Sequence, residues 1–515
     1  MAGIAGWIAR AGAAGPDEAV LSAMLGTIAH RGTEGLCGIL DRNRGRELVM
    51  AAGARDDAAR VAVVLDGTIA NAREMAAELH RRGHRFDAAS DSEILLRAYL
   101  QWDKEVAKVL SGQFTFAIWD ARKERLMLAR DRFGEKPLYL YEKGGVLAFA
   151  SETTALKKAF ALEADPGAVQ GYAARGRGSE SGTLYRGVRK LGPATQALWH
   201  FGRLIETRYW AAPDKEPFTG QPVSGGVEAF AVELEDAVRR RPADAVFLSG
   251  GLDSAALVAL ASRNNAKLQT FSFGLAEDRN SELSAAAEVA KQFGTAHHEV
   301  VASPRELSAT LRQVIVIRDA PAARPSDVAV HQLAKSARGA RRILTGEGCD
   351  EVLGGYRRYI TARLKGNFRH DLSAAQARLS DDVLERTERL GAGAGVEAHQ
   401  PFLDHGLAET VSALPDDLRV RGMATKWLLR EAARDLLPRI GPRRRGGFRV
   451  RASDVMSKEL LQEHLTSPTA WIRNFLENSD LDRMLKEYVD GKKTHEAPLW
   501  TLLNLEIWHH SCASG

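Results

Sequence analysis

The stretch VFLSGGLDS, residues Val246–Ser254, decides the fold. An apolar run leads into Ser-Gly-Gly, and a helical pattern begins directly after it. The two glycines permit positive φ and close backbone approach, and their N–H groups with the helix N-terminus form a site for an anion such as pyrophosphate. Ser249 and Ser254 add hydroxyl donors, and Asp253 is a candidate ligand for Mg²⁺, which prefers oxygen. The stretch is neither a Walker loop nor GxGxxG, and an ordinary helix cap after a strand is the alternative interpretation.

A second segment repeats this pattern of strand, glycine turn and acids. It reads ILTGEGCDE at Ile343–Glu351 and continues into LGGY at Leu353–Tyr356. Turns of this kind meet at the carboxyl ends of the strands in a doubly wound sheet, where ligands bind. The sequence therefore predicts that Asp253 and Asp350 share one or two Mg²⁺ ions, with a solvated acidic turn as the alternative.

The surrounding sequence indicates which sheet carries these loops. Strand-like runs alternate with helical stretches from about residue 225, which predicts a parallel, doubly wound sheet, and after residue 360 the chain is mostly helical. The strands are expected at Ala245–Leu248, Leu268–Phe273, His298–Val301 and Arg342–Leu344, and the helices at Ser254–Arg263, Ser281–Phe293, Ser303–Arg318 and Ser326–Arg338.

The first 160 residues or so are β-rich, and residues 172–198 have the composition of a linker carrying a further strand or two. The expected strands are Val61–Leu65, Gln113–Trp119, Arg125–Ala129, Leu138–Tyr141 and Val146–Ala150, and the expected helices are Pro16–Ala29 and Asn71–Arg82.

Composition narrows the class of protein. The 515 residues are 45% hydrophobic and 27% charged, as in a soluble globular protein, and 71 − 66 gives a net charge of only +5, which argues for no nucleic-acid partner. Three scattered cysteines fit neither a disulfide framework nor a metal knuckle. The N-terminus lacks the charged region of a signal peptide and no apolar run is long enough to span a membrane, so we expect a cytoplasmic protein without membrane association.

At this point a resemblance is plain. The chain resembles the asparagine synthetase family, whose close relatives include β-lactam synthetases and lasso-peptide cyclases. Besides SGGLDS and TGEGCDEVLGGY, the similar segments are EAHQPFLD at 397–404, TKWLLR at 425–430, ARDRFG at 129–134, KPLY at 136–139 and FASE at 149–152.

The resemblance implies an α/β protein of two domains. Residues 1–205 would form an αββα sandwich of the N-terminal-nucleophile hydrolase type, glutaminase-like but inactive. Residues 215–515 would form the ATP-pyrophosphatase synthetase domain, a doubly wound parallel sheet with a helical extension. Enzymes of this family use ATP and Mg²⁺ to convert a carboxylate into an acyl-adenylate, releasing pyrophosphate, and an amine then displaces AMP.

The resemblance also implies roles for individual residues. Lys426 would stabilise charge at the α-phosphorus and the acyl carbon, and a solvated helix lysine is the alternative. Glu347 would serve in intermediate formation and as the base for the attacking amine. ATP would be bound by Leu248, Ser249, Gly250, Gly251, Asp253, Ser254, Phe273, Thr345 and Gly346, with Asp253 and Asp350 on the metal.

The first domain departs from the pattern of an active glutaminase. Ala2 stands where the family has its nucleophilic cysteine, and a methyl group cannot form a thioester. The family's RGPD reads Arg-Gly-Thr33-Glu34, and its NGEIYN begins with Asp66 and has Thr68 for the glutamate. Several independent losses indicate a decayed site rather than one engineered change, and Cys37 is expected to be a buried small residue. We therefore predict no glutaminase activity.

The carboxylate end departs as well. Ala320 and Arg324 replace two acids of the family's DEP-ADPS run, and His399 replaces an arginine, which suggests a substrate other than aspartate. We expect a peptide or small-molecule carboxylate that carries its own amine, with lasso-peptide macrolactam formation as the first choice and a precursor peptide with its leader-processing protein as candidate partners. An ammonia-dependent asparagine synthetase, a β-lactam synthetase and a nucleotide-binding scaffold remain alternatives. The basic stretch at 439–451 would bind polyphosphate or an acidic peptide, or be a solvated loop.

Overall fold

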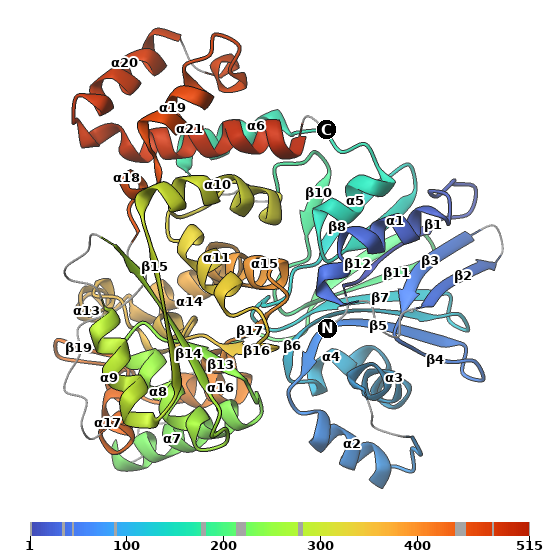
Figure 1. Cartoon of the computed structure of the whole chain (residues 1–515). Helices are drawn as coiled ribbons and strands as arrows, with labels where there is room; N and C mark the ends of the chain where they lie inside the picture. Colours follow the sequence, from blue (N-terminus) through green and yellow to red (C-terminus); the bar gives the residue numbers. More distant parts are fainter. Residues whose placement is uncertain are drawn as a thin grey trace.

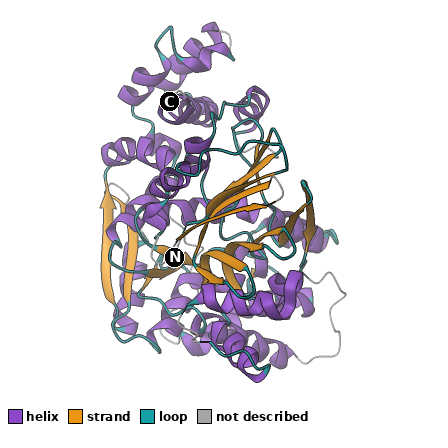
Figure 2. Ribbon diagram, turned by 90° about the vertical axis from the view of Figure 1, so that its right-hand side faces the viewer, coloured by secondary structure: helices purple, strands orange, loops and turns teal. Residues whose placement is uncertain are grey.

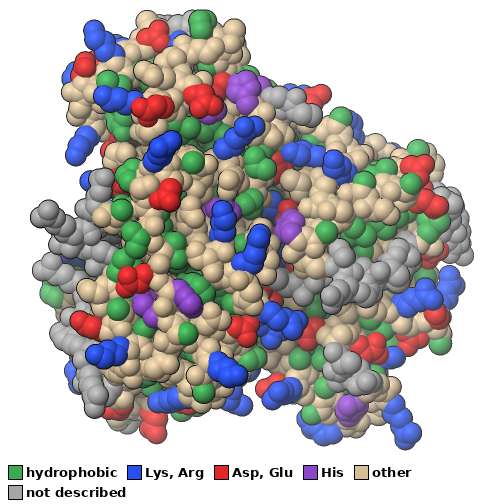
Figure 3. Space-filling view, in the orientation of Figure 1, with side chains coloured by type: hydrophobic (Ala, Val, Ile, Leu, Met, Phe, Trp, Pro, Cys, Tyr) green, Lys and Arg blue, Asp and Glu red, His purple; other side chains and the backbone are tan. Residues whose placement is uncertain are grey.

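The computed structural model of the chain describes residues 3–32, 37–43, 46–86, 90–176, 182–212, 223–276, 282–437, 450–475 and 478–513. Two domains lie side by side, and the last helices cover one end of the second domain (Figure 1). Acidic and basic side chains are interspersed over the face seen in Figure 3, in keeping with the small net charge.

The first domain is built from two antiparallel six-stranded sheets. One has the order β10-β8-β9-β1-β3-β2 and the other β12-β11-β7-β6-β5-β4. The strands of the first sheet are β1 Ala5–Ala9, β2 Cys37–Asn43, β3 Arg46–Ala52, β8 Tyr139–Lys143, β9 Val146–Ala150 and β10 Val188–Lys190. Those of the second are β4 Ala54–Asp56, β5 Val61–Ile69, β6 Gly112–Asp120, β7 Arg125–Arg130, β11 Thr195–His200 and β12 Arg203–Arg208.

Alternating side chains bury both faces of each sheet. Ile8 and Phe149 of one sheet pack with Val64 and Leu128 of the other, forming the layer between the sheets. Helices cover the outer faces: α1 Val20–Thr27 and α5 Thr153–Ala159 on one, α2 Ala72–Arg81 and α3 Asp91–Trp102 on the other. Two short helices, α4 Val106–Val109 and α6 Pro166–Arg175, complete the domain. The αββα sandwich is therefore confirmed.

Several elements differ from the sequence prediction. The stretch 172–198 carries the two further strands expected there, but they belong to the sheets and not to a linker: β10 pairs with β8, and β11 pairs with β7. Helix α1 begins at Val20 rather than Pro16, because residues 17–19 form a turn in which Asp17 accepts a hydrogen bond from the Ala19 N–H.

The second domain contains one parallel sheet of order β15-β14-β13-β16-β17. Its strands are β13 Ala245–Phe247, β14 Gln269–Leu275, β15 Ala296–Ala302, β16 Arg342–Leu344 and β17 Glu397–His399. Val246 and Leu248 pack toward α8 Leu252–Ser262 on one face, whereas Phe247 and Ile343 pack toward α10 Pro304–Arg318 and α11 Asp327–Ser336 on the other. Both faces are covered, so the predicted doubly wound sheet is confirmed. Figure 2 shows the helices and strands of the whole molecule from a second side.

The remaining helices surround this sheet. They are α7 Val223–Arg239, α9 Leu283–Phe293, α12 Cys349–Leu353, α13 Arg358–Leu364, α14 Phe368–Leu379, α15 Glu385–Gly393, α16 His405–Ala413 and α17 Trp427–Leu436, with a short hairpin of β18 Val420–Arg421 and β19 Ala424–Thr425. The helical extension comprises α18 Ala452–Val455, α19 Lys458–Leu465, α20 Asn478–Val489 and α21 Glu496–Trp508. Among the described helices, none is long and apolar enough to cross a membrane.

Candidate active site

The two glycine loops meet at the carboxyl ends of two neighbouring strands of the parallel sheet. β13 and β16 are parallel neighbours in the middle of the sheet, so the loops that follow their carboxyl ends lie side by side. The Ser-Gly-Gly turn follows β13 and ends at Gly251, the N-cap of α8. Gly250 has a φ of 71°, and a Cβ there would lie 2.9 Å from Cβ of Ala285 and from the Ala286 nitrogen. The turn therefore requires glycine.

A cavity of about 440 Å³ forms a crevice at these loops. Of the predicted site residues, seven line it: Ser249, Asp253, Ser254, Thr345, Gly346, Glu347 and Asp350. Loops separated by almost a hundred residues thus converge on one space. The side chains of Leu248 and Phe273 are buried in the core, while the Leu248 backbone bonds to Phe271 and Ser272, so contact of Leu248 and Phe273 with the adenine stays a prediction.

Lys426 joins the two loops. Its Nζ lies 2.5 Å from Oδ2 of Asp253 and 2.8 Å from Oδ1 of Asp350, and the residue is 6% exposed. Burial by itself would lower the pKa of Lys426, but the two carboxylates raise it above its ordinary value, so the lysine is a cation at neutral pH. A side chain on Gly355 would overlap both Asp350 and Lys426, so this glycine makes room for the ion pairs.

Asp253 and Asp350, the two predicted Mg²⁺ ligands, lie on either side of the Lys426 ammonium group, and Mg²⁺ binding by them stays a prediction. Two carboxylates directed at one cation form the hard oxygen donor set that this metal takes, with phosphates and water completing its shell. No group of three or more His, Cys, Asp or Glu side chains in the described part of the chain is arranged to hold a metal by itself. The donor set therefore fits a Mg²⁺ ion bound together with a nucleotide.

Glu347 faces the same cavity from the second loop. Its Oε1 accepts hydrogen bonds from Thr387 Oγ1 at 2.7 Å and Arg386 Nη2 at 3.2 Å, whereas the buried Oε2 has no partner among the described residues. Burial raises the pKa of Glu347, and Arg386 opposes the rise. Arg386 and Thr387 were missed by the sequence analysis because they lie on α15, outside every motif.

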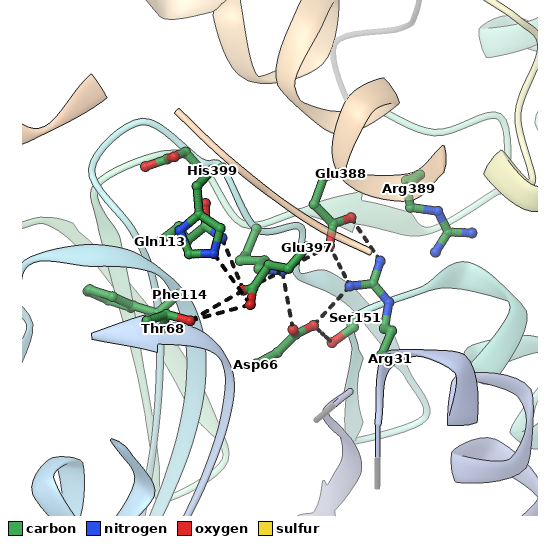
Figure 4. Close-up of polar contacts among 12 residues, drawn as sticks. Arg31, Asp66, Thr68, Gln113, Phe114, Ser151, Glu388, Arg389, Glu397 and His399 are labelled. Carbon is green, nitrogen blue, oxygen red and sulfur yellow. Dashed lines mark hydrogen bonds and ion pairs between the residues drawn. The ribbon is translucent and has the colours of Figure 1, made fainter. Parts of the chain in front are cut away.

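The pocket expected in the first domain contains a buried charge network (Figure 4). Asp66 Oδ2 accepts hydrogen bonds from Ser151 Oγ at 2.7 Å and from Arg31 Nη1 at 3.1 Å. Thr68 Oγ1 lies 3.4 Å from Oε1 of Glu397, a residue of the second domain. Asp66 and Thr68, the two residues here that differ from the family pattern, thus both contact other side chains of the protein.

Some predicted features lie outside the described residues. These are Ala2, Thr33, Glu34, residues 439–449 of the basic stretch, and the side chain of Cys37.

Comparison with known proteins gives the family. Residues 1–210 match the model of a glutamine amidotransferase domain, and residues 229–380 and 371–510 match the model of asparagine synthase. A putative glutamine-hydrolyzing asparagine synthetase of Mycobacterium tuberculosis is 28% identical, over 87% of this chain and 84% of that protein. The glutamine-hydrolyzing asparagine synthetases 1 and 3 of Bacillus subtilis are each 26% identical, over 87% and 96% of this chain and 85% and 92% of those proteins. The chain therefore belongs to the asparagine synthase family and is an ATP-dependent ligase.

Proposed function

We propose that the protein adenylates a carboxylate and captures it with an amine already present in the same substrate, forming a cyclic amide. The observation that carries the adenylation step is the convergence of the Ser-Gly-Gly turn, Asp253, Asp350 and Lys426 on one crevice. When bound, Mg²⁺ would neutralise charge on the phosphates. The buried positive charge of Lys426 would offset the charge that accumulates where carboxylate and phosphate meet.

The chemistry balances in two steps. A carboxylate oxygen attacks the α-phosphorus of ATP and the bond to the β-phosphate breaks, which gives the acyl-adenylate and pyrophosphate. The amine then attacks the acyl carbon, its proton passes to a base, and the bond to AMP breaks. Glu347 is suited to be that base because its Oε2 has no partner among the described residues and burial raises its pKa.

Two observations favour an internal amine over glutamine as the nitrogen source. Asp66 places an acceptor where an oxyanion would need donors, and its contacts with Arg31 and Ser151 hold it there. A second cavity of about 570 Å³ lies between the domains and is lined by Tyr172, Arg318 and Ala320, among others. A cavity of this volume suits a ligand larger than a free amino acid.

Macrolactam closure of a peptide, as in lasso-peptide cyclases, is the product class we favour. A β-lactam is less favoured because Glu347 stands where β-lactam synthetases have tyrosine. Ammonia-dependent asparagine formation is the second candidate, since the synthetase crevice alone would suffice for it. The expected partners are the substrate peptide and the proteins that supply it, with no nucleic acid or membrane, and the expected location is the cytoplasm.

The test is product analysis on the full-length protein. It is incubated with Mg²⁺ and ATP and with each of three substrate sets: aspartate with ammonium, aspartate with glutamine, and synthetic peptides that carry an acidic side chain and a free N-terminus. We expect AMP and pyrophosphate by phosphorus NMR and the loss of one water from a peptide by mass spectrometry. Release of ADP and phosphate would reject the mechanism. Amide formed only with ammonium would establish the second candidate, and glutamate released from glutamine would show an active first domain.

A further inference from the structure

Helix α15 lies between the two domains and contacts both. Its residues Glu385, Glu388 and Arg389 pair with the first domain, whereas Arg386 and Thr387 hold Glu347 in the synthetase crevice. Five consecutive residues of one helix thus divide their contacts between two sites of different domains.

Glu388 contacts the first domain through a buried, bidentate ion pair with Arg31. Arg31 Nη1 and Nη2 lie 2.6 and 2.8 Å from the two oxygens of Glu388, and Arg31 is 1% exposed (Figure 4). Next to it, Arg389 Nη1 lies 2.6 Å from Oε2 of Glu152. Paired hydrogen bonds of this kind define direction as well as distance, so they fix the rotation of α15 about its axis.

A second connection reaches the Glu347 loop through β17. The Thr345 N–H, at the start of that loop, donates to the His399 carbonyl at 2.9 Å. On the same strand, Glu397 accepts from Gln113 Nε2 at 3.0 Å and lies 3.4 Å from Lys136 Nζ, both in the first domain. The loop is therefore held on two sides by elements that the first domain anchors.

We propose that the first domain has become a support for the synthetase crevice, in which Arg31 and Glu388 are positioning residues that orient Glu347 through α15. The proposal rests on the proposed function only in taking Glu347 as a group that acts on substrate. A rotation of α15 that moved Thr387 Oγ1 by a few tenths of an ångström would weaken its 2.7 Å hydrogen bond to Glu347. The buried charge network around Arg31 and Asp66 in the first domain would thereby position a residue of the second domain.

Hydrogen exchange of the full chain, followed by mass spectrometry, tests this without a substrate. Glu388→Gln keeps the shape of the side chain and removes its charge, so the buried Arg31 loses one of its three carboxylate partners while Asp66 and Glu152 remain. We expect exchange about tenfold faster in peptides that cover α15 and the 345–350 loop. The 249–251 turn, which lines the same crevice but has no described contact with α15, should exchange as in the wild type.

Two further variants complete the design. Asp236→Asn removes a matched carboxylate from an exposed pair with Arg239 and should change neither loop. The double variant Arg31→Met with Glu388→Leu removes the unpaired buried charge but also the paired hydrogen bonds that orient α15, so it should regain global stability while the 345–350 loop stays loosened. It also guards against a single variant that merely folds poorly.

Each outcome decides the question. Equal loosening of both loops would show a loss of global stability and overturn the positioning role, as would loosening of α15 without the 345–350 loop. Selective loosening of α15 and the 345–350 loop, in the double variant as in Glu388→Gln, supports it. If that pattern appears but no carboxylate yields AMP, the positioning role stands and the proposed function fails.

Discussion

Replacing Lys426 by methionine should have two effects of opposite sign. The substitution keeps an unbranched side chain only one atom shorter and removes its charge from between Asp253 and Asp350. Both residues are unbranched at Cβ, so the cost of the positive φ of 52° at this position is nearly unchanged. The change therefore isolates the charge.

The first effect concerns the empty protein. Each lysine–aspartate attraction is of the order of 4 kcal/mol before desolvation, for an effective dielectric constant of about 20. A tenfold gain in Mg²⁺ affinity corresponds to only about a third of one such attraction. Removing the ammonium group that competes for the two carboxylates should therefore be enough to produce it. Isothermal titration of MgCl₂ into the nucleotide-free protein measures this, and Mg²⁺ binding to Lys426→Met should be at least that much tighter.

The second effect concerns the reaction. Without the preorganised cation, pyrophosphate release should fall about 10²–10³-fold. Lys108→Met, which removes a half-exposed lysine paired with Glu105, is the matched control and should leave both measurements unchanged. Unchanged or weaker Mg²⁺ binding in Lys426→Met would refute the competition, and near-normal pyrophosphate release would refute the role of the charge.

Three other substitutions test separate features. Burial raises the pKa of Glu347, and a base must be ionised to accept a proton, so the rate of amide formation should rise with pH through an inflection above the ordinary pKa of 4.5. Glu347→Gln should remove that inflection. A wild-type rate that does not depend on pH would contradict this prediction. Burial also raises the pKa of Glu135, so folding favours its protonated form and the protein loses stability as pH rises above 4.5. Glu135→Gln should therefore raise the melting temperature by a margin that grows with pH. A margin that stays constant with pH would refute the raised pKa of Glu135. Ala320→Phe should fill part of the cavity between the domains and lower kcat/KM for a peptide about tenfold or more without changing the KM for ATP, whereas the exposed control Ala374→Phe should change neither.

The loops of the site could be predicted because their signals are local. A strand, a glycine turn and an acid lie within nine residues in VFLSGGLDS, and the alternation of strands and helices places two such turns at the carboxyl ends of strands in a parallel sheet. The structure places Lys426 beside Asp253 and Asp350, a contact that nothing in the spacing shows, and its role at the α-phosphorus stays a prediction.

The support of Glu347 could not be predicted. Arg386 and Thr387 reach it across 39 and 40 positions of sequence, from a helix whose pattern reveals only that it is buried. In the same way, β1 and α3 were not anticipated. The strand Ala5–Ala9 is apolar throughout and shows no alternation, whereas Ser90, which caps α3, is a local signal for the start of that helix. Contacts between distant segments are decided by packing, which periodicity does not encode.

The strand order of the parallel sheet separates the segment that would determine the acyl substrate from the loops that would bind ATP. The proposed nucleotide end of the crevice comes from the loops after β13 and β16. The segment between α10 and α11 contributes Ala320 to the cavity between the domains and Arg324 to the crevice. Selection for a new acyl substrate can therefore act on that short segment while the ATP machinery stays constant. A library at Ala320 and Ala323, which line the cavity between the domains and not the crevice, should explore substrate range while leaving the loops after β13 and β16 unchanged.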